Sequence, residues 1–228
     1  MSALVGAPAV FGASPRLLIV AHRAANELAA LRRAEATGVD LVEADIWYWR
    51  GRLEVRHLKT LGRVPLLWDK WRLEGSWRPR LLFDDVVRAA QPATEFMFDL
   101  KGRDRALPPL LRATMERLAA GRRYTVSSQS WRLLEPFRSL DAVRVVHSVG
   151  NARMLRALPH WLAGGAAAAV AIDHRALTPA RAEALRRMTP TLFAWSVNDV
   201  RRADELVSWG VNGIISDAYT LYCAQATA

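Results

Sequence analysis

Residues 17–45 read LLIVAHRAANELAALRRAEATGVDLVEAD, and this stretch contains one complete unit of the predicted fold. Leu17 to Ala21 is an apolar run with the character of a buried strand, and roughly Asn26 to Thr37 has the amphipathic spacing of a helix. Gly38 ends that helix, because glycine tolerates the left-handed conformation common after helix C-termini. A second apolar run, Asp40 to Ile46, follows at once. Strand, helix and strand in this order predict a βαβ unit with parallel strands.

The same alternation continues to the end of the chain. Further strands are predicted at Glu95 to Leu100, Tyr124 to Ser128, Val143 to His147, Ala168 to Asp173, Thr191 to Ser196 and Gly213 to Ser216, with Leu53 to His57 extending the second strand. Helices are predicted from Phe83, over Arg105 to Ala120, Trp131 to Phe137, Asn151 to Leu162, Pro179 to Met188 and Val200 to Trp209, and from Ala218 onward. Eight such units predict an α/β fold, the (β/α)₈ TIM barrel. An open doubly wound sheet is the alternative, but no glycine-rich phosphate fingerprint follows the first strand.

We expect a flexible N-terminal arm at 1–15 and a single barrel domain at 16–228, with a short insertion at 58–80. Composition and charge then limit the cellular compartment and the partners. The single cysteine, Cys223, excludes an internal disulfide framework, and residues 1–15 lack the basic start of a secretory signal. We therefore expect a cytoplasmic protein. The net charge of +10 favours anionic partners, although an arginine- and alanine-rich composition can also arise from GC-rich coding.

The insertion, Leu58 to Arg80, is the one irregular region. It holds Trp68, Trp71 and Trp77 among the basic residues Lys70, Arg72, Arg78 and Arg80. One interpretation is a packed cover over the barrel rim. The other is a lid that contacts substrate or anionic lipid headgroups, since tryptophan suits such interfaces. We expect a small-molecule partner and no nucleic acid.

Charged residues and histidines recur near the ends of the first apolar runs. They are His22, Arg23, Glu43, Asp45, His57, Asp99 and Lys101. Glu43 and Asp45 stand at i and i+2 on one strand and therefore share a face, as do Asp99 and Lys101. Three carboxylates on two strands can bind one hard divalent cation, Mg²⁺ or Ca²⁺. The alternative is ion pairing of Asp45 and Asp99 with Arg23 and Lys101.

The two strand-end histidines suit proton transfer, because the unperturbed pKa of histidine is about 6.5. If His22 and His57 face one rim, one acts as general base and the other as general acid. The remaining histidines are not part of this group of strand-end residues, and no role is assigned to them. They are His147, His160 and His174.

These segments resemble the glycerophosphodiester phosphodiesterase family. Its signatures appear here in order as IVAHR, AANELAAL, GVDLVEAD, LEVRHLK, FDLK, WSVND and GVNGIISD, spanning residues 17 to 217. The resemblance implies a (β/α)₈ fold and hydrolysis of glycerophosphodiesters to glycerol 3-phosphate and an alcohol. It implies His22 and His57 as the acid–base pair and Glu43, Asp45 and Asp99 as ligands of one Mg²⁺ or Ca²⁺. It also implies that Arg23, Lys101 and Trp195 bind the substrate.

Three positions depart from the family pattern. Ala25 replaces a glutamate, Leu58 replaces the aspartate that follows the second histidine, and Asp99 replaces a glutamate. The two histidines and a carboxylate at each metal position are retained. The family pattern therefore predicts the reaction more firmly than it predicts the substrate.

Two other functions stay open. The related sphingomyelinase D-like phospholipases share the histidines, the metal and an Asp-x-Lys strand, which implies activity on phospholipids as a lysophospholipase D. A catalytically inactive barrel that binds anions through its basic surface is the third hypothesis. The metal, the alcohol headgroup and the oligomeric state are left open by the sequence.

Overall fold

The fold is a closed barrel of eight parallel strands. A computed structural model describes residues 16–60, 66–69, 72–75, 77, 80–162 and 169–223, so the expected arm at 1–15 lies outside the described residues. The barrel strands are β1 (Leu18–Ala21), β2 (Leu41–Trp49), β8 (Phe96–Leu100), β9 (Tyr124–Ser128), β10 (Val143–Val149), β11 (Ala169–Asp173), β12 (Leu192–Trp195) and β13 (Gly213–Ser216). Each pairs in parallel with the next, and β1 pairs with both β13 and β2. The predicted (β/α)₈ barrel is confirmed.

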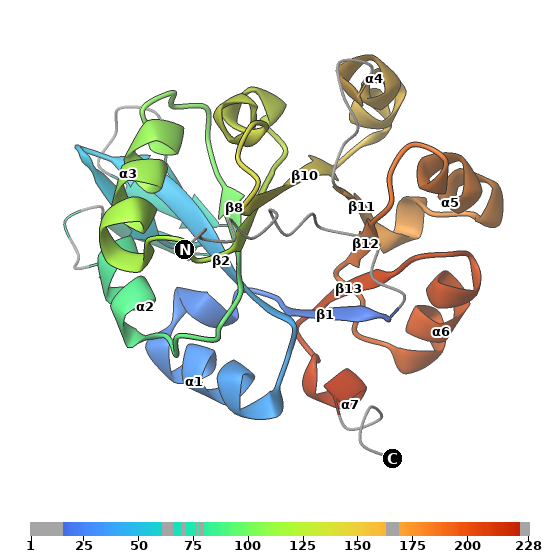
Figure 1. Cartoon of the computed structure of the whole chain (residues 1–228), viewed down its shortest axis with the longest axis horizontal. Coiled ribbons are helices and arrows are strands. Elements are labelled where there is room, and N and C mark those ends of the chain that lie inside the picture. The colour runs from blue at the N-terminus through green and yellow to red at the C-terminus, as the bar shows by residue number, and fades with distance from the viewer. Residues whose placement is uncertain are drawn as a thin grey trace, which may run out of the picture.

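Helices surround the strands as an outer ring (Figure 1). They are α1 (Leu28–Thr37), α2 (Phe83–Ala89), α3 (Leu107–Ala119), α4 (Ala152–Leu162), α5 (Pro179–Arg186), α6 (Val200–Ser208) and α7 (Thr220–Cys223). Four short 3₁₀ turns are described, η1 (Ala24–Asn26), η2 (Trp131–Leu133), η3 (Glu135–Phe137) and η4 (His174–Ala176). Among the described residues, none of the helices combines the length and the apolar character that crossing a bilayer requires.

The predicted helix at Trp131 to Phe137 is wrong in kind, because this segment forms the two 3₁₀ turns η2 and η3. Pro136 accounts for the break. Proline has no N–H to donate and disfavours the α conformation of the residue before it. Trp131 and Phe137 are nevertheless buried, so the segment still covers the barrel as a helix would.

The barrel interior is a separate small core. Its buried residues are Leu18, Val20, Leu41, Met97, Val146, Ala169, Ala171, Phe193 and Ile215. Gly213 makes room for the largest of them, because a Cβ at this position would lie 2.2 Å from the Phe193 ring. The opposite faces of the same strands pack against the helices. Burial on both faces explains why the strands read as continuous apolar runs.

The second strand continues beyond the barrel rim and folds back on itself. After β2 the chain turns at Arg50 and Gly51, both with positive φ, and returns as β3 (Arg52–Val55) antiparallel to β2. The short strand β7 (Leu81–Leu82) pairs with the other edge of β3. The predicted strand Leu53 to His57 therefore ends at Val55, and His57 reaches the rim on the segment after this hairpin.

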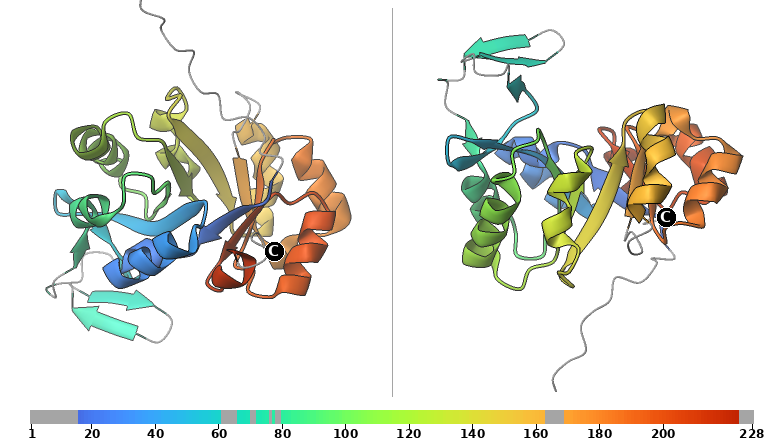
Figure 2. Two further views of the ribbon diagram at one scale, coloured as in Figure 1. Left: turned by 60° about the horizontal axis from the view of Figure 1, so that its bottom comes forward. Right: turned by 90° about the horizontal axis from the view of Figure 1, so that it is seen from above.

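The insertion contains a second, three-stranded sheet. Its strands are β4 (Lys59–Thr60), β5 (Leu66–Asp69) and β6 (Arg72–Gly75), paired antiparallel in that order. The prediction that this region is irregular is thus wrong for these residues. Figure 2 shows β5 and β6 standing clear of the barrel body in both views. We refer to β4, β5 and β6 as the small sheet.

His147 is a buried histidine between the barrel and the helices. Its exposed fraction is 1%, and its ring lies edge-on to Trp131 with a centroid distance of 5.7 Å. Neither ring nitrogen has a hydrogen-bond partner among the described residues. Burial, reinforced by the Arg138 guanidinium, lowers the pKa of His147 to about 4, while Glu135 opposes the shift. The folded protein therefore holds this imidazole neutral.

The burial of His147 should make the stability of the protein depend on pH. The unfolded chain binds a proton at this residue near its ordinary value of about 6.5, but the folded chain binds it only near 4, so the free energy of unfolding falls as the pH drops between these values. The shift corresponds to about 3 kcal/mol in total. The variant His147→Leu should lose this part of the slope in urea titrations between pH 7 and pH 4.5. Equal slopes for both proteins would contradict the assignment.

Candidate active site

Three carboxylates from two neighbouring strands converge at the carboxyl-terminal end of the barrel. Glu43 and Asp45 lie on one face of β2, and Asp99 of β8 is the parallel-register partner of Asp45. One oxygen from each carboxylate lies within 4.8 Å of the other two. Glu43 is 3% exposed and Asp45 is fully buried. The structure thus brings the three predicted metal ligands into one cluster.

Two cationic side chains border this cluster. Lys101 Nζ lies 2.7 Å from Asp45 Oδ1 and also pairs with Asp99. Arg23 Nε lies 3.7 Å from Asp45 Oδ2, and the Arg23 backbone N–H donates to Glu43 Oε2 at 2.6 Å. The Arg23 side chain is 41% exposed and that of Lys101 is 26% exposed. An anion in the adjoining cavity can therefore reach both cations.

Burial and charge act on these groups in opposite directions. Burial, reinforced by the Asp45 carboxylate, raises the pKa of Glu43 well above its usual value. Burial opposes ionisation of Asp45 too, but the Lys101 ammonium and hydrogen bonds from neighbouring side chains outweigh it and lower the pKa of Asp45. Burial also disfavours the charged form of Lys101, but nearby carboxylates, Asp99 foremost, raise its pKa above the usual range. Asp45 and Lys101 are therefore both charged at neutral pH, and Glu43 gains most from a further cation.

His22 is oriented by a carboxylate from the opposite end of the sequence. Its Nδ1 lies 2.8 Å from Asp217 Oδ1, and Asp217 directly follows β13. Asn198 holds Asp217 in turn, since Asn198 Nδ2 donates to Asp217 Oδ2 at 3.2 Å and Asn198 Oδ1 accepts from the Asp217 backbone N–H at 3.0 Å. The hydrogen bond from His22 is the main cause that lowers the pKa of Asp217 to about 2. With Nδ1 engaged, Nε2 is the His22 nitrogen left for proton transfer.

His57 is held between two carboxylates. Its Nδ1 lies 3.2 Å from Asp45 Oδ2, and its Nε2 lies 3.3 Å from Asp69 Oδ2 on β5. The fold-back of β3 places it there, because the backbone N–H of the preceding residue, Arg56, donates to the Asp45 carbonyl at 3.0 Å. The His57 side chain is 28% exposed. Both predicted acid–base histidines therefore lie at the rim that carries the carboxylates.

Several residues around the site had no role in the sequence-based prediction. Asn26 exchanges two hydrogen bonds with Asp45, through its Nδ2 at 2.8 Å and its Oδ1 at 2.9 Å. Ser127 donates to Asp99 Oδ1 at 3.1 Å. Ser127 lies in β9 and Asp217 follows β13. Polar residues near the ends of predicted strands are the site candidates, and this criterion also selects these two. Asp69 lies in the insertion, where no sequence signal marks it.

These side chains surround a cavity of about 340 Å³. Its lining includes His22, Arg23, Glu43, His57, Lys59, Asp99, Lys101, Ser127, Gln129, Ser148 and Trp195. Trp195, at the end of β12, contributes an aromatic wall opposite the polar strands β2 and β8. All the predicted site residues except Asp45 line the cavity, and Asp45 is buried beside it. The arrangement joins two histidines, two cations and an acidic cluster in one space.

The donor set fits a hard divalent cation. All three side chains offer carboxylate oxygens, and oxygens bound to one Ca²⁺ at about 2.3–2.6 Å lie at most about 5 Å apart. The 4.8 Å limit of the cluster meets this condition. Ion pairing with Arg23 and Lys101 accounts for Asp45 and Asp99, but within the described residues Glu43 forms no salt bridge. A bound cation would add to the partial compensation that Glu43 receives from the Lys101 charge and the Arg23 backbone N–H.

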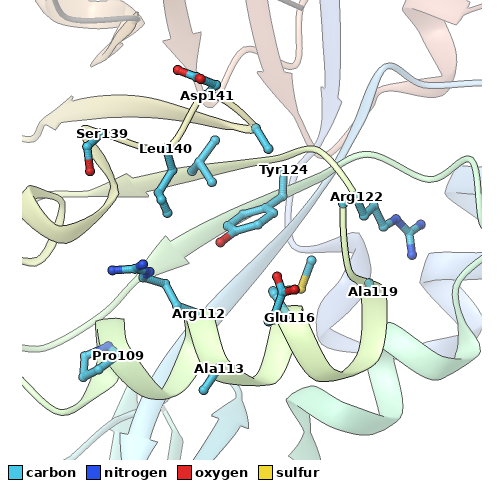
Figure 3. Close-up of a pocket in the computed structure, with 14 residues that line it drawn as sticks. Pro109, Arg112, Ala113, Glu116, Ala119, Arg122, Tyr124, Ser139, Leu140 and Asp141 are labelled. Carbon is cyan, nitrogen blue, oxygen red and sulfur yellow. The ribbon is translucent and has the colours of Figure 1, made fainter. Parts of the chain in front are cut away.

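A larger hollow, of about 770 Å³, lies at the other end of the barrel, where β9 and β10 begin. Figure 3 shows the Tyr124 ring between Arg112 and Glu116 of α3. Burial raises the pKa of Tyr124 to about 12, so its hydroxyl stays protonated. Active sites of such barrels form at the carboxyl-terminal ends of the strands. The smaller cavity is therefore the candidate site, and this hollow is not.

Solved structures of similar fold cover nearly the whole chain. A phosphodiesterase of Oleispira antarctica, solved in complex with its product sn-glycerol 3-phosphate, is 15% identical, with a TM-score of 0.73 over 92% of this chain and 97% of that one. A glycerophosphodiester phosphodiesterase of Thermotoga maritima is 15% identical, with a TM-score of 0.73 over 93% and 99%. One from Agrobacterium tumefaciens is 20% identical, with a TM-score of 0.64 over 93% and 100%. No family model and no curated protein matches the chain. Similarity at this level of identity shows the fold.

Proposed function

We propose that this protein hydrolyses glycerophosphodiesters to glycerol 3-phosphate and an alcohol, with the help of one divalent cation. The observation that carries the proposal is the convergence of the Glu43, Asp45 and Asp99 carboxylates beside Lys101 in one rim cavity. The similar structures named as glycerophosphodiester phosphodiesterases support it, as does the one that holds sn-glycerol 3-phosphate. Mg²⁺ or Ca²⁺ is the proposed cation.

Each side chain has a defined task in this proposal. Arg23 and Lys101 bind the phosphate oxygens. One histidine, His22 or His57, accepts the proton of the attacking glycerol hydroxyl, and the other donates a proton to the leaving alcohol oxygen as its bond to phosphorus breaks. Water then opens the resulting cyclic phosphate with the two roles exchanged. When bound at the three carboxylates, the cation polarises a phosphoryl oxygen and offsets developing charge.

The direct test is an assay of the purified protein on glycerophosphocholine and glycerophosphoethanolamine, with Mg²⁺, with Ca²⁺ and with a chelator. We expect glycerol 3-phosphate to form with at least one cation and to disappear with the chelator. Glu43→Gln, which removes one donor charge without changing shape, should be inactive with either cation. A folded preparation that makes no cation-dependent product from either substrate overturns the proposal.

Asp217→Asn should slow the reaction while leaving the His22 ring in place. An asparagine can still contact Nδ1, but through its amide it can favour the wrong tautomer, and it no longer stabilises the imidazolium. In an analogous serine-protease dyad, the equivalent change lowers kcat by about 10⁴. We expect kcat to fall at least about a hundredfold here, within the usual contribution of acid–base catalysis. KM should change little, and an Asp217→Asn protein with normal kcat would show that Asp217 has no role in orienting His22.

A second candidate is a lysophospholipase D-like activity on phospholipids that carry an acyl chain. The exposed apolar side chains of the small sheet favour it, since Trp68 pairs with Lys59, a residue that lines the cavity. A mass-spectrometric product screen over glycerophosphodiesters and lysophospholipids separates the two activities. Product from acylated substrates alone would select the second candidate.

A further inference from the structure

The small sheet exposes an unusual set of large apolar side chains. Among the described residues, Trp68 is 39% exposed, Leu73 is 63% exposed and Trp77 is 74% exposed; the first two belong to the small sheet, and Trp77 lies two residues after its last strand. The other exposed large apolar residues, Val207 and Leu221, lie apart on α6 and α7. Single exposed apolar residues are ordinary, whereas a group of them on one element marks a contact surface.

The strand register places Trp68 and Leu73 on one face of the small sheet. Lys59 of β4 pairs with Trp68 of β5, and Trp68 pairs with Leu73 of β6, so the three form a row across the sheet. The neighbouring row contains Leu67 and Glu74, which are 1% and 7% exposed. A sheet with one solvated face normally points polar residues outward. Here the outward row is mainly apolar, with a lysine at its edge.

Trp77 extends the same surface beyond the strands. A Cβ on Gly75 would lie 2.3 Å from the Trp77 indole, so this ring rests directly against the Gly75 backbone. The ring is therefore supported on one side and open to solvent on the other. Lys59 Nζ lies 5.7 Å from the centre of the Trp68 ring, which adds a cation to the apolar row.

The segment is also strongly basic. The insertion, residues 58–80, contains six lysines and arginines and two acidic residues, so it carries +4 of the net charge of +10. Both acids face basic groups on their own side of the sheet. Glu74 Oε2 accepts from Arg80 at 2.6 Å, and Asp69 contacts His57. Both carboxylates are thus paired within the protein, and the net charge of the segment is positive.

We propose that the small sheet is a docking surface for an anionic phospholipid bilayer. Indole rings favour the boundary between headgroups and acyl chains, and basic residues are attracted to anionic lipid. A second copy of this chain is a poorer partner, because it would bring the same positive charge to the contact. Nucleic acid would meet the basic residues but leave the apolar row of Trp68 and Leu73 without a partner.

The surface is joined to the site. Lys59 belongs to the outward row and also lines the rim cavity, and Asp69 of β5 contacts His57. Docking would therefore bring lipid headgroups to the mouth of the cavity. The substrate class follows as phosphodiesters that reside in a membrane, and this second step rests on the proposed function, whereas the docking itself does not.

Vesicle co-sedimentation tests the docking. The full chain should sediment with vesicles of three parts phosphatidylcholine to one part phosphatidylserine, bind phosphatidylcholine vesicles much more weakly, and dissociate from the mixed vesicles in high salt. The double variant Trp68→Ser and Leu73→Ser should lower the partition coefficient at least about tenfold, because it removes apolar area that binding buries. The matched control, Val207→Ser with Leu221→Ser, should bind like the original chain. Thermal melts establish that both variants are folded.

The outcomes separate docking from the proposed function. No sedimentation of the original chain with the mixed vesicles at low salt overturns docking, while hydrolysis of soluble glycerophosphocholine is measured independently. Equal binding by the small-sheet and control variants also overturns it. So does a small-sheet variant that turns a lipid-free oligomer into a monomer, since the surface then joins copies of the chain. Vesicle binding by a protein that hydrolyses none of the substrates supports docking and contradicts the proposed function.

Discussion

Replacing Asp45 by asparagine should remove cation-dependent activity and also destabilise the folded protein. The Asp45 carboxylate lies 2.7 Å from Lys101 Nζ and 3.2 Å from His57 Nδ1, and its pKa is lowered because the fold stabilises its charge. Loss of one partner from a buried ion pair costs about 3–5 kcal/mol when the other charge is left alone, and the loss should be smaller here because Lys101 keeps Asp99. Loss of a donor to a catalytic cation removes several kcal/mol of charge stabilisation, which corresponds to at least about a thousandfold in rate. Urea unfolding in chelator and steady-state kinetics with added cation measure the two effects.

Glu43→Gln is the matched control for this prediction. The pKa of Glu43 is raised, so the fold disfavours its charge, whereas it favours that of Asp45. A neutral isostere at Glu43 should therefore keep or increase the free energy of unfolding in chelator at neutral pH, while activity is lost. A loss of stability in Asp45→Asn, with no loss in the equally inactive Glu43→Gln, would distinguish a charged metal cluster from a packed polar core. Destabilisation by both changes would contradict this electrostatic account.

His22→Gln should lower kcat by about 10²–10⁴, the usual contribution of a positioned acid or base. Its ring makes one described side-chain hydrogen bond, to Asp217 at 2.8 Å, and the side chain is 15% exposed. The stability change should therefore stay near 1 kcal/mol, the net value of one hydrogen bond. Steady-state assays on glycerophosphocholine measure kcat, and thermal melts measure the stability.

His160→Gln provides the comparison for His22. His160 is exposed on α4 and lies away from the rim cavity, so the same substitution there should leave kcat unchanged. Retention of normal kcat in His22→Gln would remove this histidine from the proposed reaction. Equal losses in both variants would instead show that glutamine substitutions disturb the fold in general.

The barrel is predictable because its repeating unit is local. The run from Leu17 to Ala21, the amphipathic helix and the run from Asp40 to Ile46 each depend on a few neighbouring residues, and the structure has β1, α1 and β2 there. The insertion is different. Strands β4 and β6 are short, and the face that Trp68 and Leu73 share follows from their pairing and not from a long alternating pattern. Short pairs of this kind leave little signal in a sequence.

The contacts of the site are likewise of two kinds, those that follow from spacing along a strand and those that do not. Glu43 and Asp45 share a face because they are two residues apart on a strand, and Asp99 and Lys101 have the same spacing on β8 and in the residue after it. The partner of His22 is 195 residues away, and the Nε2 of His57 meets an aspartate from the small sheet. Spacing along the chain carries no information on such pairs, since barrel closure and the β3 fold-back create them.

Local periodicity in the sequence predicts the order of the eight barrel strands, and the residues at the ends of these strands give the chemical types of the site. Three features follow from the tertiary structure: the contact of Asp217 with His22, the contact of Asp69 with His57, and the apolar row of Trp68 and Leu73 that faces solvent. These contacts join segments whose relative positions are set by strand pairing and core packing across the whole barrel, so they cannot be read from neighbouring residues.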